Sequence, residues 1–406
     1  MFLSNLKKNG TAGWLVVVVV LLNILLSCRP EMSRVPAQYR PLLDSAFARA
    51  GENAGQLREA LKNARPGEEE AVAFLISYMP DRDLRELPSA FILENVKVAL
   101  QARREFSWAA ALPDSVFLNE VLPYASLNER RDNWRADFYE RFSPVVKNCK
   151  TLREAVDSVN RNIREVVKVE YNTRRQKADQ SPYESMEQGM ASCTGLSILL
   201  TDAFRAVGIP SRIAGTPLWT NLRGNHNWCE VWIDGQWYFT EYYPDALNKS
   251  WFLADAGKAD PEKPIHWIYA SSFKPGGTIF PCVWDSTIRY VPAENVTDRY
   301  ISLYRQQLSG QKLADDELIL YVSLYSAEDT SDGNARVSGR VAVTDGSKEL
   351  DYGYTAGPRD DLNKLLAFTL KKNSAYTFVF AGKEGQQLSQ IYRTGETSGE
   401  IVRLHQ

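Results

Sequence analysis

One segment, residues 192–243, limits the fold more than any other part of the chain because it contains a helix pattern followed by a hairpin pattern. Apolar residues at helical spacing follow Cys193, and Ser192 before it is a typical N-cap. Gly208 and Pro210 end the periodic run. The segment therefore predicts a helix with Cys193 in its first turn, where free backbone N–H groups and the helix dipole favour a thiolate.

The hairpin follows from Asp234-Gly235, a typical two-residue loop, which lies between two runs of aromatic and β-branched residues. Pairing across this loop places Glu241 opposite Trp228. Alternation along the strands then puts His226 on the same face as Glu241, as its diagonal neighbour. A carboxylate in this position can hold an imidazole ring while the other ring nitrogen acts on a thiol.

A second acid competes with Glu241 for this role. Asp245 has the same parity and is the other diagonal neighbour of His226. Pro244 cannot donate to a strand ladder and tends to end the strand before Asp245. We therefore favour Glu241 and keep Asp245 as the alternative. The chain has only three histidines, so there are few candidates for an imidazole base.

At these residues the sequence resembles the transglutaminase-like superfamily, whose fold is papain-like. The resemblance covers about 100 residues and rests on four motifs: Ser192-Cys193, Gly208-Ile209-Pro210-Ser211-Arg212, His226-Asn227-Trp228-Cys229-Glu230 and Trp237-Tyr238-Phe239-Thr240-Glu241. It implies that Cys193 is the nucleophile, His226 the base and Glu241 the third member of a triad. The family's usual aspartate is a glutamate here.

The N-terminus carries the pattern of an export signal. Lys7 and Lys8 precede an apolar run, and Leu25-Leu26-Ser27-Cys28 follows it. This last stretch resembles a bacterial lipobox, in which Cys28 is acylated. Residues 1–28 are therefore predicted to be a lipoprotein signal peptide. The location expected from it is the bacterial cell envelope, with the protein lipid-anchored to a membrane and facing the periplasm or the surface.

The remaining chain is too long for one ordinary core. Helical spacing broken by prolines predicts a helical domain over residues 34–150, in which the charges at 129–132 and Arg135 are expected to be a solvated face. Residues 151–312 are predicted to be a transglutaminase-like domain with a strand-rich extension. From 316 to 406 the period changes to two, which predicts a β-sandwich without a catalytic constellation. The fold class expected is α+β.

These patterns favour an enzyme with a thiol active site that hydrolyses peptide or amide bonds through a thioester, with crosslinking less favoured. The expected partners are a peptide, protein or peptidoglycan-like amide and the membrane. The alternative is an inactive module that binds peptide or glycan. A net charge of −2 with interspersed signs gives no case for nucleic acid. No cofactor or metal is expected, because a cysteine nucleophile needs none and no cysteine pair has zinc-site spacing.

Overall fold

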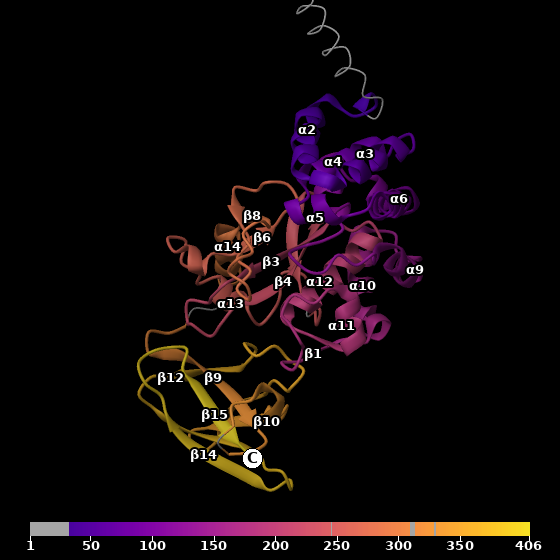
Figure 1. Ribbon diagram of the computed structural model, residues 1–406. Coiled ribbons are helices and arrows are strands. Elements are labelled where there is room, and N and C mark those ends of the chain that lie inside the picture. The colour runs from indigo at the N-terminus through magenta and orange to yellow at the C-terminus, as the bar shows by residue number, and fades with distance from the viewer. Residues whose placement is uncertain (1–31, 245, 309–312, 329) are drawn as a thin grey trace, which may run out of the picture. The chain divides into compact units, whose positions relative to one another are not determined.

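The computed structural model describes residues 32–244, 246–308, 313–328 and 330–406 (Figure 1). It forms two compact units, one ending at Val96 and one comprising Lys97–Gln406. The predicted signal peptide with Cys28, and the alternative acid Asp245, lie outside the described residues. Among the helices that are described, none is both long and apolar enough to span a membrane.

The first unit is helical. Its apolar residues recur at helical spacing and are buried between the helices, with Leu43, Leu57 and Leu75 fully enclosed. Its helices are α2 (Arg40–Arg49), α3 (Ala54–Asn63), α4 (Glu69–Tyr78), α5 (Asp81–Glu86) and the first part of α6 (Ser89–Glu105).

The second unit contains a helical layer built around α12 (Cys193–Ala206), which packs against α9, α10 and α11. The amphipathic helix α10 begins where Thr151 accepts a hydrogen bond from the backbone N–H of Glu154, as an N-cap does. The other helices here are α7 (Ser107–Ala110), α8 (Asp114–Val116), a π-helical turn (Phe117–Val121), α9 (Arg135–Val146), α10 (Leu152–Val167), α11 (Pro182–Gln188), α13 (Leu253–Ala256) and α14 (Thr297–Leu308).

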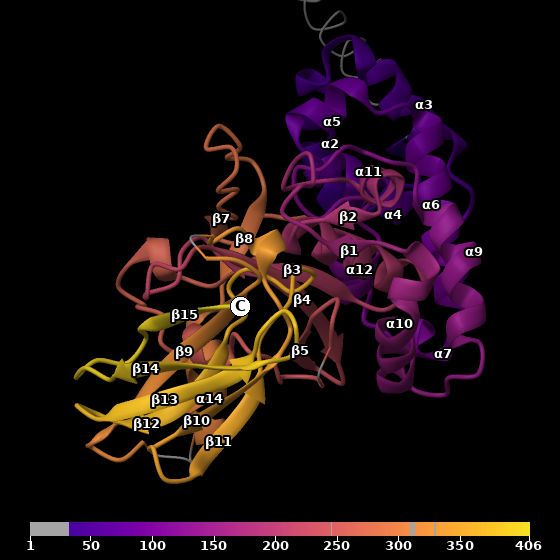
Figure 2. The ribbon, with the colours of Figure 1, turned by 90° about the horizontal axis from the view of Figure 1, so that it is seen from below.

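An antiparallel sheet of six strands, in the order β5-β4-β3-β6-β8-β7, lies against α12 (Figure 2). The central strand β3 is buried along its whole length, so the sheet is covered on both faces there. The strands are β3 (Ser211–Thr216), β4 (His226–Ile233), β5 (Gln236–Thr240), β6 (Tyr269–Ser271), β7 (Thr278–Ile279) and β8 (Pro292–Asn295); β1 (Glu170–Tyr171) and β2 (Met190–Ala191) form a separate parallel pair.

The C-terminal part of the second unit consists of two sheets, in the orders β11-β10-β13-β14 and β12-β9-β15, around one apolar core. The strands are β9 (Glu317–Tyr325), β10 (Arg340–Thr344), β11 (Glu349–Tyr354), β12 (Leu366–Lys371), β13 (Ala375–Ala381), β14 (Gln387–Arg393) and β15 (Ile401–His405). The α+β fold class, with helices towards the N-terminus and sheets towards the C-terminus, is confirmed. The domain boundaries given by the sequence stay predictions.

The charged residues just before α9 and at its first position are largely buried, with Arg130 the exposed exception, so the solvated face predicted for them is wrong. The Arg135 guanidinium donates to the carbonyls of Arg205 and of residues 121–123, and only 2% of the residue is exposed. Glu129, also 2% exposed, accepts from the backbone N–H groups of Ser126 and Leu127. Because a buried charge must be paired or hydrogen-bonded, these side chains fix the loop against α12.

Candidate active site

The position of Cys193 follows from how α12 begins. The hydroxyl of Ser192 accepts a hydrogen bond from the backbone N–H of Gly195 at 3.1 Å and caps the helix, which makes Cys193 its first residue. A β-carbon on Gly195 would lie 2.9 Å from Cβ of Ala191, so only glycine permits this close packing. Cys193 is therefore held at a rigid helix start, and it remains partly exposed.

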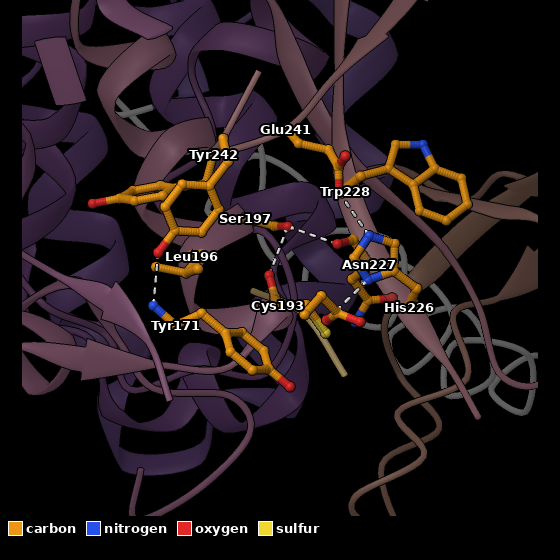
Figure 3. Close-up of a pocket in the computed structure, with 11 residues that line it drawn as sticks. Tyr171, Cys193, Leu196, Ser197, His226, Asn227, Trp228, Glu241 and Tyr242 are labelled. Atoms are coloured by element: carbon orange, nitrogen blue, oxygen red, sulfur yellow. Dashed lines mark hydrogen bonds and ion pairs between the residues drawn. The ribbon is translucent and has the colours of Figure 1, made fainter. Parts of the chain in front are cut away.

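His226 is the first residue of β4, and its partner Glu241 lies directly after β5. The β4–β5 register pairs Cys229 with Thr240 and is the register predicted from the two-residue loop. His226 Nε2 lies 2.8 Å from Glu241 Oε1, within hydrogen-bonding distance (Figure 3). The structure thus brings the predicted base and the predicted acid into direct contact.

Glu241 is fixed at both ends of its carboxylate. One oxygen faces His226, and the other accepts a hydrogen bond from the hydroxyl of Ser250. The Asn160 amide donates to the Glu241 backbone carbonyl at 3.0 Å. A carboxylate held in this way favours the tautomer with a proton on Nε2, which leaves Nδ1 facing the region of Cys193.

A second acid reaches the same ring from the C-terminal sandwich. Asp361 lies in the loop between β11 and β12, and its Oδ2 is 3.4 Å from His226 Nδ1. The Cys193 sulfur, His226 Nδ1 or Nε2 and an Asp361 oxygen all lie within 4.8 Å of one another. The sequence predicted no catalytic constellation within the sandwich, and it did not predict that one residue of the sandwich reaches the site. The sequence gives no signal for Asp361, because 120 residues and several strands separate it from Glu241.

The loop that carries Asp361 is attached to the core by three hydrogen bonds. The Asn363 amide donates to the Asn225 carbonyl at 3.0 Å, and the Arg223 guanidinium donates to the Asn363 carbonyl at 2.9 Å. The backbone N–H of Leu362 donates to the Tyr171 hydroxyl at 3.4 Å. The carboxylate is thus placed by contacts of the two residues that follow it in the loop and not by one side chain alone.

The electrostatics of the ring follow from these neighbours. Burial disfavours a charged His226, but the adjacent Asp361 carboxylate, together with Cys193 and Glu241, raises the pKa of His226 well above its usual value. Burial likewise works against a charged Asp361, yet the charged His226 ring and hydrogen bonds from Asn363 hold the pKa of Asp361 below its usual value. The two groups therefore form an ion pair inside the site.

Asn227 connects the strand that carries His226 to the helix that carries Cys193. Its amide donates to the Thr194 hydroxyl at 2.8 Å, and its backbone carbonyl accepts from the Ser197 hydroxyl at 3.1 Å. Its side-chain oxygen would lie 1.9 Å from a β-carbon at Gly215 on the neighbouring strand, so glycine is required there. Sequence reasoning assigned no role to Asn227, whose contacts are all made outside its own strand.

Aromatic rings pack against the imidazole. The ring of Trp251 lies 4.8 Å from that of His226, with Phe252 at 5.3 Å and Trp228 at 5.7 Å. These rings help to bury the imidazole, which is 2% exposed, and restrict its orientation. A small cavity of about 30 Å³ remains in front of Cys193, lined also by Tyr171, Tyr242 and Asp361.

Part of the chain is similar to known proteins. Residues 141–242 match the Transglutaminase-like superfamily. A candidate cysteine protease from Cytophaga hutchinsonii is 17% identical, with a TM-score of 0.27, over 34% of this chain and 45% of that protein. A TGase is 15% identical, with a TM-score of 0.22, over 27% of this chain and 30% of that protein. The chain thus spans less than half of either solved structure. The search of curated proteins gave no match. The protein contains a transglutaminase-like core.

Proposed function

We propose that this protein is a cysteine-dependent hydrolase that cleaves peptide or amide bonds through a thioester on Cys193. The observation that carries the proposal is the contact between His226 and Glu241, with Cys193 beside the same ring. The arrangement is the nucleophile, base and orienting acid that thiol catalysis requires.

Each step can be assigned to a group in the site. The Cys193 sulfur attacks the carbonyl carbon of the amide, the carbon–nitrogen bond breaks, and the leaving amine takes a proton from the His226 ring. Water then attacks the thioester while His226 accepts its proton, which releases the carboxylic acid and restores the thiol. Glu241 stabilises the ring whenever it carries the extra proton, before the amine leaves and again after water attacks. If an amine replaces water, the same thioester gives crosslinking.

The proposed substrates are peptides, proteins or peptidoglycan-like amides, and the proposed location is the cell envelope, with a lipid on Cys28. The support for this location is the sequence 25–28, Leu-Leu-Ser-Cys, after an apolar run. In a lipoprotein-processing bacterial host, the protein should partition into a detergent phase, and Cys28→Ala should remain aqueous or unprocessed. Aqueous partition of the unmodified protein would contradict the anchor and would leave the thiol chemistry in place.

The decisive test is thiol reactivity, because the chain provides its own control thiols. Burial raises the pKa of both Cys229 and Cys282 to about 12, so neither should react near neutral pH. We expect iodoacetamide to alkylate Cys193 at least about tenfold faster than either. His226→Ala should slow this reaction, and His266→Ala, which changes a histidine outside the site, should not.

Peptide mapping by mass spectrometry gives all of these rates in one experiment. Equal rates at Cys193, Cys229 and Cys282 would show that the site is not activated and would favour an inactive binding module. A peptide-library digest with and without a primary amine then separates hydrolysis from amine transfer, because the two products differ in mass.

A further inference from the structure

Three side chains of different chemistry converge in front of the helix start: the Cys193 thiol, the His226 ring and the Asp361 carboxylate. Their donor atoms lie within 4.8 Å of one another, and His226 Nδ1 lies 3.4 Å from Asp361 Oδ2. His226 is 2% exposed, and within the described part of the chain its Nδ1 makes no hydrogen bond. A buried ring nitrogen without a hydrogen bond, facing a thiol and a carboxylate, has the chemistry of a metal ligand.

The spacing of these atoms fits a small tetrahedral ion. Zinc bonds sulfur at about 2.3 Å and nitrogen or oxygen at about 2.0–2.2 Å, which separates its ligand atoms by roughly 3.3–3.8 Å. The 3.4 Å between His226 and Asp361 already has this length. The remaining separations need to contract by about 1 Å at most to reach it. The cavity of about 30 Å³ at this point has room for an ion and one water molecule.

The hydrogen-bond partners of His226 and Asp361 also orient these side chains as a metal site requires. His226 contacts Glu241 through Nε2, and a histidine that binds zinc through one nitrogen commonly donates its other N–H to a carboxylate. The second oxygen of Asp361 accepts a hydrogen bond from the backbone N–H of Asn363 at 2.8 Å, which leaves Oδ2 directed at the ring. Both ligands are therefore oriented before an ion arrives.

Charge and ligand type select the ion. Two carboxylates and a thiol surround one imidazole, so a further positive charge is favoured there. A sulfur, a nitrogen and one oxygen suit zinc, whereas magnesium and calcium prefer oxygen ligands alone. We propose that Cys193 Sγ, His226 Nδ1 and Asp361 Oδ2 bind a zinc ion, with water as the fourth ligand.

Zinc at this site would act as an inhibitor of the proposed hydrolase. The thiol and the charged His226 ring each lose a proton to solution as sulfur and Nδ1 bond to zinc, no electron is transferred, and the sulfur is no longer free to attack a carbonyl. Because Asp361 comes from the sandwich loop, the same ion would also fix that loop on the core. Only the inhibitory consequence rests on the proposed function; the binding itself does not.

The test uses the full chain and zinc chloride, with cobalt chloride as a spectroscopic substitute. Calorimetry should give one zinc per chain, and cobalt should give the near-ultraviolet absorption of a cobalt–thiolate bond. Asp361→Asn should weaken zinc binding at least about tenfold, and Cys193→Ala should also abolish the cobalt–thiolate band. Asp360→Asn, which changes the adjacent carboxylate in the same loop, should bind zinc as the unmodified protein does.

The outcomes distinguish this inference from the proposed function. Zinc should slow alkylation of Cys193 by at least about tenfold, and a chelator should restore the rate. Rapid alkylation that zinc does not slow, or zinc affinity unchanged by Asp361→Asn, would overturn the metal site and leave the thiol enzyme intact. Tight zinc binding to a chain whose Cys193 is no more reactive than Cys229 without zinc would support the site and contradict the enzyme.

Discussion

Glu241 and Asp361 approach the same imidazole ring from two regions of the molecule that are organised differently. Glu241 belongs to the hairpin that carries His226 and contacts Nε2. Asp361 belongs to a loop of the sandwich and faces Nδ1, on the side of Cys193. We propose that Glu241 orients the ring as a base, whereas Asp361 binds the inhibitory zinc ion beside Cys193.

Replacing the two acids one at a time is the strongest test of this division. Glu241→Gln should lower kcat by about 10²- to 10⁴-fold, because the ring loses the partner that fixes its tautomer. Asp361→Asn should leave kcat within about tenfold of the unmodified protein, because Nε2 keeps its partner. Steady-state kinetics on a cleaved peptide measures both. Equal losses in the two variants would show that the acids act as one unit.

The difference between the acids also explains what could be predicted from the sequence. Strand alternation and a two-residue loop determine how His226 lies relative to Glu241, so the local sequence pattern was sufficient to predict their contact. The helix that begins at Cys193 follows from apolar spacing and an N-cap in the same way. Asp361 could not be found, because its position depends on how a sandwich loop meets the core. No periodicity within one element encodes that contact.

A further acid of the hairpin, Glu230, allows a structural role to be distinguished from a catalytic one. Glu230 is fully buried and pairs with Arg212 at 2.9 Å, and it also contacts Arg299 and the Tyr300 hydroxyl. Glu230→Gln should lower the free energy of unfolding by about 3 kcal/mol, since it removes the fully buried negative charge that pairs with the buried Arg212 guanidinium.

Urea denaturation followed by fluorescence measures this loss, and Glu241→Gln is the matched comparison. Glu241 is 14% exposed, and it faces a histidine that can lose its proton. Its replacement should therefore cost less than about 1 kcal/mol of stability. If Glu241→Gln unfolds the protein as readily as Glu230→Gln, a loss of activity in that variant would reflect unfolding and not catalysis.

Replacing the residue that holds Glu241 should lower kcat more than replacing the residue that holds the loop of Asp361. Ser250→Ala removes the hydroxyl that donates to Glu241 and should lower kcat by about tenfold, because the carboxylate can then rotate. Asn363→Ala removes the amide that ties the sandwich loop to Asn225 and should leave kcat within about twofold. It should instead increase hydrogen exchange over residues 355–365. A loss of kcat in Asn363→Ala would place the loop in the catalytic step.

The smallest expected effect is the pH dependence of stability that Asp361 contributes. The raised pKa of His226 stabilises the fold fully below about pH 6.5, and this contribution is lost as the pH rises through the folded-state value. The lowered pKa of Asp361 stabilises the fold above about pH 4, and this contribution to stability is lost in acid. The stability difference between the unmodified protein and Asp361→Asn should therefore be largest near pH 5–6.5 and shrink towards pH 9 and pH 3. Urea midpoints across this range measure it, and a difference that does not change with pH would show that Asp361 and His226 are not an ion pair in solution.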